Sequence, residues 1–260
     1  MDCTICHSSN TREIISLPLA KHIYLCKNCH NAFTFPQPSL PDYKNEDFHA
    51  NGLVTDKLTR FEELPEEIRT SYSIQLHLIE KYLKKDDLIL EIGGGEGIFI
   101  DLLYKQGYSV EMTEPSLSAS SRAIKRGFKV YNNYFQEAKF DSAYSLIIMA
   151  HVLEHIPDPL SIMEMLKLHL SSNGMVLLTQ TNFNGFMPRF LKENWYAWVP
   201  EQHFSHFSIE GIRYIAENSN FEIVDYKYSR LYHGKSIYHQ VLRYIPFLQD
   251  QIHVLLKLKS

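Results

Sequence analysis

The hydrophobic residues in the middle of the chain follow two alternating periods. Between 65 and 84 they recur every three or four positions, which predicts an amphipathic helix. A short apolar run over 88–92 meets a cluster of glycines, and the helical period returns over 98–106. Strands that alternate with helices predict an α/β fold, a parallel sheet with right-handed crossovers and helices on both faces. The further expected strands are 109–113, 128–131, 142–149 and, after a turn at Asn173-Gly174, 175–180, and the further helices are 116–126 and 160–170.

The C-terminal third is less regular. Residues 182–208 are rich in aromatic side chains and could form the wall of a pocket or a core beneath a surface loop. A helix is expected over 209–219. The apolar runs 221–228 and 236–243 are expected to pair as antiparallel strands at the sheet edge, which makes seven strands in all. From Pro246 on, apolar residues lie at helical spacing, and this segment could cap the core or contact a partner.

Composition narrows the class of protein. The chain has 260 residues, 45% of them hydrophobic and 22% charged, as expected for one large folded domain with a small attachment. Its formal net charge of −4 gives no general attraction for nucleic acid. No apolar run approaches the ~20 residues that cross a bilayer, and the N-terminus lacks the features of a signal peptide. We therefore expect a cytoplasmic protein with reduced cysteines.

All four cysteines lie in two Cys-x-x-Cys pairs near the N-terminus. Each such turn directs two thiolates to one point, and two turns complete a tetrahedral zinc site. Four thiolates leave no open position, so the site is expected to be structural. The neighbouring His7 and His30 could replace a cysteine, although both are expected to be bystanders. The predicted zinc ligands are Cys3, Cys6, Cys26 and Cys29.

This pattern suggests three segments. Residues 1–40 are expected to form a zinc-binding knuckle, which ends at three prolines between 36 and 41. Residues 41–64 could be a plain linker or a lid over an active site. Residues 65–260 are expected to form the main domain.

The glycine cluster after residues 88–92 carries the main chemical signal. Glycines let the backbone turn sharply, and the following helix start offers free N–H groups to a ligand. The dinucleotide fingerprint G-x-G-x-x-G fails here, because its third glycine would be Ile98. The spacing is instead E-x-G-x-G-x-G. A second acid, Glu114, ends the next strand, where a carboxylate can accept hydrogen bonds from both hydroxyls of a ribose.

This arrangement resembles motif I of the class I S-adenosylmethionine (SAM) methyltransferases. The resemblance implies a Rossmann-like, seven-stranded methyltransferase sheet with SAM bound at the strand ends, in addition to the zinc knuckle. It also implies that the turn after 128–131 borders the adenine and that the segment after the fourth strand passes the methyl donor. The donor-binding residues expected from it are Glu91, Gly93, Gly95, Gly97, Glu114, Pro115, Phe135, Gln136, Ala150 and His151.

Residues 151–155 also spell H-x-x-E-H, a pattern of zinc proteases. That pattern needs a continuous helix to place both histidines on one face. Pro157 and Pro159 follow immediately and oppose such a helix, so we do not favour a protease.

With the cysteines included, the chain resembles the zinc-containing deoxysugar C-methyltransferases. Members of that group pair a histidine of a His-Ile-Pro segment with one that follows an acid before Phe-Ser. The matching residues are His155 and His203, although Gln202 replaces the acid and Glu201 lies one position earlier. The sequence lacks a counterpart of that group's further C-terminal domain, which leaves a different acceptor or O-methylation open.

The expected function is methyl transfer from SAM to a small-molecule acceptor, such as a sugar nucleotide or related metabolite. An acceptor that must lose a proton needs a general base, and histidine suits that role near neutral pH. The resemblance favours His203 first and His155 second. Two alternatives stay open: an RNA methyltransferase whose knuckle holds RNA, which the low basicity disfavours, and a non-catalytic protein that keeps the fold.

Overall fold

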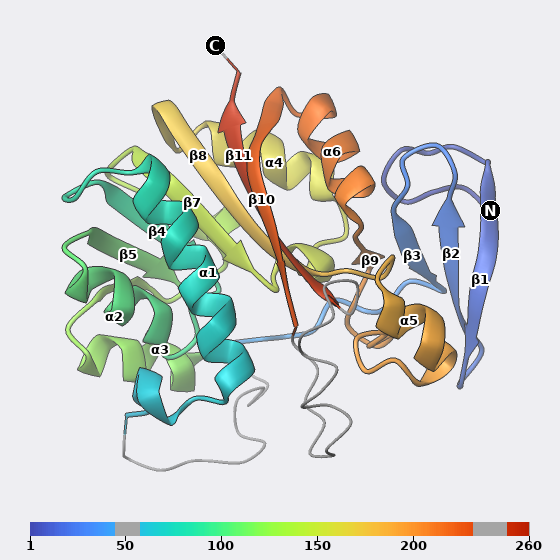
Figure 1. The fold of residues 1–260 in the computed structure, drawn as a ribbon, viewed down its shortest axis with the longest axis horizontal. Coiled ribbons are helices and arrows are strands. Elements are labelled where there is room, and N and C mark those ends of the chain that lie inside the picture. Colours follow the sequence, from blue (N-terminus) through green and yellow to red (C-terminus); the bar gives the residue numbers. More distant parts are fainter. Residues whose placement is uncertain (45–57, 231–248, 260) are drawn as a thin grey trace. The chain divides into compact units, whose positions relative to one another are not determined.

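The structure is a computed structural model that describes residues 1–44, 58–230 and 249–259 (Figure 1). The chain divides into two compact units, and each is treated by itself. The first unit comprises residues 1–40, 151–164 and 178–259, and the second comprises 41–150 and 165–177. Most of the segment expected to be a linker or lid, 45–57, lies outside the described residues, so the predicted three-segment division stays a prediction.

The larger sheet confirms the predicted Rossmann-like α/β fold. Its seven strands run in the order β10-β11-β8-β7-β4-β5-β6. The pairs β4–β5, β4–β7 and β5–β6 are parallel, whereas β10 and β11 are antiparallel, so the sheet is mixed. The strands are β4 (Leu88–Ile92), β5 (Ser109–Thr113), β6 (Lys129–Tyr131), β7 (Tyr144–Ala150), β8 (Leu170–Thr181), β10 (Phe221–Ser229) and β11 (Gln251–Leu258).

In the second unit, helices pack their hydrophobic faces against strands β4, β5 and β6, as the helical spacing of their hydrophobic residues predicts. Phe99, Ile100 and Leu103 form one buried face of α2, and Ile100 packs with Met112 of β5 and Ala123 of α3. The start of α3 is capped by the Ser116 side chain, which accepts a hydrogen bond from the Ala119 N–H. The helical elements here are η1 (Phe61–Glu63), α1 (Glu66–Tyr82), α2 (Ile98–Lys105), α3 (Leu117–Lys125) and η2 (Phe135–Glu137).

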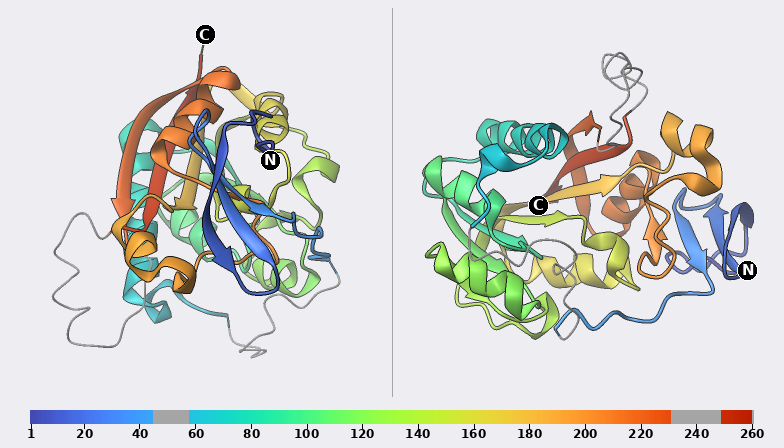
Figure 2. Two further views of the ribbon diagram at one scale, coloured as in Figure 1. Left: turned by 90° about the vertical axis from the view of Figure 1, so that its right-hand side faces the viewer. Right: turned by 90° about the horizontal axis from the view of Figure 1, so that it is seen from below.

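The first unit contains a small antiparallel sheet in the order β1-β2-β3-β9 (Figure 2). The N-terminal segment supplies β1 (Thr11–Leu17), β2 (Lys21–Cys26) and β3 (Ala32–Phe35). Strand β9 (Ser205–His206) comes from far along the sequence and pairs with β3. The predicted knuckle is therefore not a separate appendage, because a distant strand completes its sheet.

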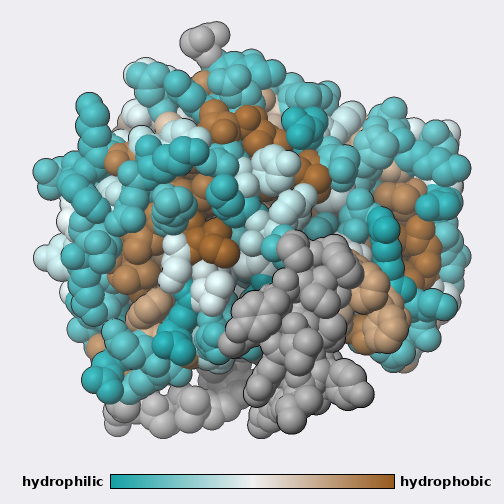
Figure 3. Space-filling model, viewed as in Figure 1, coloured by the Kyte–Doolittle hydropathy of each residue, from teal (hydrophilic) through white to brown (hydrophobic). Residues whose placement is uncertain are grey.

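Trp195 and Trp198 are buried in a hydrophobic cluster with residues of β1 and β2, so the aromatic segment forms core rather than a bare loop. Helix α5 (Phe186–Leu191) lies in this segment, and its Phe186 and Phe190 are exposed. Figure 3 shows hydrophobic residues gathered over α5 and the small sheet. The other helical elements are η3 (Leu153–His155), α4 (Pro159–Lys167), which the two units share, η4 (Lys192–Asn194) and α6 (Ile209–Asn218).

Two local predictions were wrong. The expected turn at Asn173-Gly174 lies inside β8, which begins at Leu170. The helical spacing near the C-terminus was misleading, because that segment is strand β11 between β10 and β8. Six consecutive residues of β11, 251–256, are buried, so both faces of the strand are covered and its burial does not alternate. The predicted strand 236–243 lies outside the described residues. Among the residues that are described, no helix has the length and hydrophobicity to span a membrane.

Candidate functional site

The glycine loop after β4 has the backbone geometry that its sequence requires. Gly93, Gly95 and Gly97 have φ angles of 69°, 55° and 74°, a region that side chains disfavour. A Cβ atom at Gly97 would lie 3.1 Å from the Cβ of Ala123, so the loop also packs closely on α3. The sequence reading missed Gly94, where a Cβ would lie 2.7 Å from Met112 Cε. The loop is thus bare main chain that a ligand can approach.

Glu91 is buried at the end of β4, and its Oε2 accepts no hydrogen bond from the described residues. Burial, together with the charge of Glu114, raises the pKa of the Glu91 carboxyl to about 8. A buried carboxyl without a partner is costly unless a donor or a cation meets it. The ammonium group of SAM would be such a partner, so this position and the bare loop fit the methyl donor.

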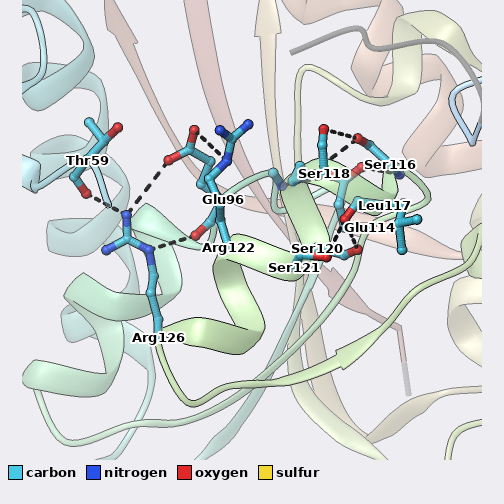
Figure 4. A network of polar contacts seen from close by, with 12 residues as sticks. Thr59, Glu96, Glu114, Ser116, Leu117, Ser118, Ser120, Ser121, Arg122 and Arg126 are labelled. Carbon is cyan, nitrogen blue, oxygen red and sulfur yellow. Dashed lines mark hydrogen bonds and ion pairs between the residues drawn. The ribbon is translucent and has the colours of Figure 1, made fainter. Parts of the chain in front are cut away.

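Glu114 faces the glycine loop from the end of β5 (Figure 4). Its Oε2 accepts a hydrogen bond of 2.9 Å from the Gly95 N–H, and its Oε1 accepts one of 2.8 Å from the Ser116 N–H. Each carboxylate oxygen can accept a second hydrogen bond. The Glu114 side chain is therefore oriented by these backbone N–H groups, and its oxygens can accept further hydrogen bonds from ribose hydroxyls. Its contact with a ribose remains a prediction.

An ionic network ties the loop to α3, and the sequence reading missed it. Arg122 Nε lies 3.1 Å from Glu96 Oε1, and Arg126 Nε donates to the Glu96 carbonyl at 2.8 Å (Figure 4). Arg126 also donates to the carbonyl of Thr59. The available signal was the i, i+4 spacing of the two arginines, which places them on one helix face. The loop is thus held by Arg122 and Arg126 of the α3 region through Glu96, in addition to the hydrogen bond from Gly95 to Glu114.

The remaining predicted donor-binding residues of the second unit lie at or after the ends of strands β5, β6 and β7. Phe135 is buried in η2 and packs against Phe140, with ring centroids 5.2 Å apart, while Gln136 is exposed. The Pro115 carbonyl accepts a hydrogen bond from Asn132, and Ala150 ends β7. Their contact with a donor remains a prediction.

His151 follows β7 with a left-handed φ of 55°. The Gln251 side-chain amide donates from its Nε2 to Nε2 of the His151 ring, at 2.6 Å. The other ring nitrogen of His151, Nδ1, lies 3.3 Å from Glu154 Oε1 and donates to it. The following helix η3 has only three residues, so the continuous helix of the H-x-x-E-H proteases is absent here, as predicted. His151 is a partner of Glu154 rather than the first ligand of a protease site.

The structure brings His155 and His203 together, with Glu154 as a third member that the sequence reading had not assigned to this role. One ligand atom from each lies within 4.8 Å of the others. Burial lowers the pKa of His155, and it lowers that of His203 to about 4. Burial raises the pKa of Glu154, but the hydrogen bond from His151 and the nearby imidazoles outweigh it and lower that pKa to about 2.

The segment that carries His203 is held by strand β3. The Phe204 N–H donates to the Glu154 carbonyl at 2.8 Å, and the Thr34 N–H donates to the Phe204 carbonyl at 3.1 Å. The Thr34 hydroxyl donates to the His203 carbonyl at 2.7 Å and lies 3.1 Å from Nε2 of His206. A hydroxyl has one proton, so His206 is the donor in the second contact. The cysteine-bearing segment thus supports the histidine cluster directly.

The four cysteines also converge. Their sulfur atoms lie within 4.8 Å of one another, with 3.6 Å between Cys3 and Cys29 and 3.5 Å between Cys6 and Cys26. A tetrahedral zinc ion with Zn–S bonds of about 2.3 Å would separate the sulfurs by about 3.8 Å. The donor set therefore fits zinc. His7 and His30 are exposed, as expected of bystanders.

The comparisons agree with this geometry. Residues 62–226 match a family model described as "Methyltransferase domain". The ubiquinone biosynthesis O-methyltransferase of Salmonella paratyphi A is 30% identical over 107 residues, which are 37% of this chain and 43% of that protein. The alignment therefore spans less than half of that relative.

Solved methyltransferase structures share the fold at low identity. A SAM-dependent methyltransferase from Methanosarcina mazei superposes with a TM-score of 0.52 at 20% identity, over 70% of this chain and 97% of that chain. The plantazolicin methyltransferase BpumL, solved with a desmethylPZN analogue and SAH, gives a TM-score of 0.52 at 16% identity. The superposition covers 74% of this chain and 83% of that chain. The family match covers more than half of the chain, and the chain therefore belongs to the family described as "Methyltransferase domain".

Proposed function

We propose that the protein transfers the methyl group of SAM to a small-molecule acceptor, a sugar nucleotide or related metabolite, at an oxygen or carbon that must lose a proton. The observation that carries this proposal is the cluster of the buried Glu154 and His203 with the half-buried His155. The relatives give general support, since one is named as an O-methyltransferase of ubiquinone biosynthesis and another as the methyltransferase of plantazolicin.

The second unit is proposed to hold the donor. When bound, SAM supplies an electrophilic methyl group, and the chain's part is to hold and orient it. Glu91 would meet the ammonium group, the glycine loop would admit the methionine part, and Glu114 would accept the ribose hydroxyls. Pro115, Phe135, Gln136, Ala150 and His151 are the further proposed donor contacts.

The histidine cluster is proposed to take the acceptor's proton. His203 is the first candidate for the base, because its Nδ1 lies 3.1 Å from the Ala197 carbonyl and must be the donor there. That bond fixes the tautomer and leaves Nε2 as the basic nitrogen. His155 is the second candidate. The cysteine cluster is proposed to hold a structural zinc ion that stabilises the segment behind this site.

The test is a screen of nucleotide sugars and small hydroxylated metabolites with methyl-labelled SAM. With an accepted substrate, His203→Ala should lower turnover by about 10²–10⁴-fold, the usual contribution of a general base, and leave the SAM affinity within twofold. Replacement of the exposed His77 by alanine is the matched control and should change neither value. Full turnover in His203→Ala would remove it as the base, and SAM binding without transfer to any small molecule would overturn the substrate class.

A further inference from the structure

We propose that Glu154, His155 and His203 bind a divalent first-row cation such as Zn²⁺, at a site separate from the four cysteines. The inference rests on the proposed function and deepens it, because it assigns the chemistry of the same cluster. A carboxylate oxygen of Glu154 and one ring nitrogen each of His155 and His203 lie within 4.8 Å of one another. An ion with ligands at about 2.0–2.2 Å separates them by at most about 4.4 Å, so small side-chain movements would complete the site.

The ligand types favour this class of ion. Imidazole suits zinc, iron, copper and nickel, and two histidines with one carboxylate form the protein ligand set of several catalytic metal sites. Three protein ligands leave positions open for a hydroxyl or carbonyl oxygen of an acceptor. The cysteine cluster differs in both respects, because its four thiolates complete a tetrahedron.

The surroundings orient all three side chains as ligands. His203 Nδ1 donates to the Ala197 carbonyl, and the His155 ring makes a hydrogen bond to the Gln202 backbone. Metal-binding histidines commonly donate their second ring N–H to such acceptors. Glu154 is held in turn, since its Oε1 accepts from His151 Nδ1. His151 therefore occupies the position of an outer partner that orients the carboxylate.

One buried atom points to a ligand independently of these contacts. The Glu154 side chain is only 2% exposed, and its Oε2 accepts no hydrogen bond from the described residues. A buried carboxylate oxygen is normally hydrogen-bonded or bound to a cation. The neighbours that converge on it, His155 and His203, offer ring nitrogens that can bind the same ion.

A bound cation would change the part that the histidines play. Their ring nitrogens would hold the ion, and an acceptor hydroxyl on the ion would lose its proton at a lower pH than in water. The O–H bond would break with its proton passing to water, and the oxygen would then take the methyl group as the C–S bond of SAM breaks. Without a bound ion, His203 and His155 remain the base candidates described above.

The experiment counts ions on the full chain. The protein is dialysed against Zn²⁺, freed of loose metal and analysed by mass spectrometry of the elements. Two ions per chain are expected in the wild type and in the control variant His77→Ala, but one in Glu154→Gln and in His203→Asn. Calorimetry with SAM and circular dichroism must show that both variants remain folded. A wild type that binds one ion, or folded variants that still bind two, would overturn the proposal.

A second measurement covers the case in which a variant does not fold. Limited chelation of the wild type should remove the weaker ion first, lower turnover at least tenfold, and be reversed by added Zn²⁺. Turnover that is unchanged when one ion of two is lost would overturn the role in the reaction. The two proposals fail differently: one ion per chain with intact methyl transfer rejects the cation alone, whereas two ions without transfer to any small molecule reject the proposed function alone.

Discussion

Glu91 in the second unit and Glu154 in the first are both buried carboxyl groups, and in each the Oε2 atom accepts no hydrogen bond from the described residues. Their pKa values nevertheless move in opposite directions, to about 8 for Glu91 and to about 2 for Glu154. Glu91 has the negative Glu114 as its charged neighbour, whereas Glu154 has three histidines. Burial raises the pKa of both carboxyl groups and is the main cause at Glu91, whereas at Glu154 the hydrogen bond from His151 and the nearby imidazoles outweigh it.

The two regions also differ in how the chain builds them. The central part of the proposed donor region, from Glu91 to Glu114, comes from a strand, the loop after it and the residue that follows the next strand. The histidine cluster needs segments near 34, 154, 203 and 251. SAM affinity is therefore expected to depend mainly on the backbone shape of the donor region. Turnover is expected to depend also on the distant residues that support the histidine cluster.

The largest effect is expected from Gly95→Arg. The backbone there has a positive φ and its N–H donates to Glu114, so a long side chain would strain and fill the loop. SAM affinity, measured by calorimetry, should fall by more than about 100-fold, which corresponds to about 2.7 kcal/mol. Gly127→Arg is the matched control, because Gly127 also has a positive φ but faces open space. An unchanged affinity in Gly95→Arg would refute the proposed donor cradle.

Glu91→Gln should separate the charge of this residue from its shape. Since the folded pKa is raised above the ordinary value of 4.5, the wild type has the full contribution of Glu91 below pH 4.5 and loses it as the pH rises through 8. The variant should therefore gain roughly 1–4 kcal/mol relative to the wild type between pH 5 and 8.5 in urea unfolding. It should also bind SAM about tenfold more weakly at pH 8, because the carboxylate is missing.

The exposed Glu217→Gln is the control for that measurement, and it should change stability by less than about 0.5 kcal/mol at any pH. If the stability difference between Glu91→Gln and the wild type did not change with pH, the contrast between the two buried carboxyls would be lost.

Thr34→Val should affect the histidine cluster and leave the donor region unchanged. The substitution keeps the shape but leaves the His203 carbonyl and the His206 ring N–H without their partner. Such a loss costs about 1–3 kcal/mol, so turnover should fall about tenfold while SAM affinity stays the same. Thr34→Ser keeps the hydroxyl and should retain most of the turnover. A loss in Thr34→Ser as large as that in Thr34→Val would contradict the assignment to the hydrogen bonds, because Ser keeps the hydroxyl and lacks only the methyl group.

Arg122→Ala should have the smallest effect. Its ion pair with Glu96 is mostly buried and supports the glycine loop from outside the proposed donor contacts. We expect SAM affinity to fall about two- to fivefold, which corresponds to roughly 0.4–1 kcal/mol. Lys105→Ala is the control, because its pair with Asp101 is more exposed, and it should leave the affinity unchanged. A loss as large as that of Gly95→Arg would mean that the loop collapses without the network.

Local patterns predicted a large part of the fold. Helix α1, the succession from β4 to β7, and α6 lie within a few residues of their expected positions, because each element has a period that its own residues display. The helical spacing failed at β11, in which residues 251–256 are all buried. When both faces of a strand are buried, its apolar residues need not alternate with polar ones, so a short segment can match the spacing of a helix as well as that of a strand.

Some residues of the candidate site could likewise be predicted from local spacing, and others could not. The sequence predicted Glu91, the spaced glycines, Glu114 and the four cysteines as site residues, because each group has a fixed spacing along one or two short segments. It did not predict the close packing at Gly94, the Glu96–Arg122 pair or the position of Glu154 beside the two histidines. These depend on a close approach, on a contact between a loop and a helix 26 residues further on, and on burial.

By itself the sequence determined the succession of strands and helices from α1 to β7, the glycine loop after β4 and the spacing of the cysteines. Hydrophobic periods and glycine positions act through bonds between near neighbours in the chain, so they can be read without coordinates. Tertiary structure decided that strand β9 joins the sheet of the cysteine segment and that three residues from two distant segments converge on one buried point. Those outcomes depend on which surfaces pack together and which charges become neighbours, and no local spacing encodes them.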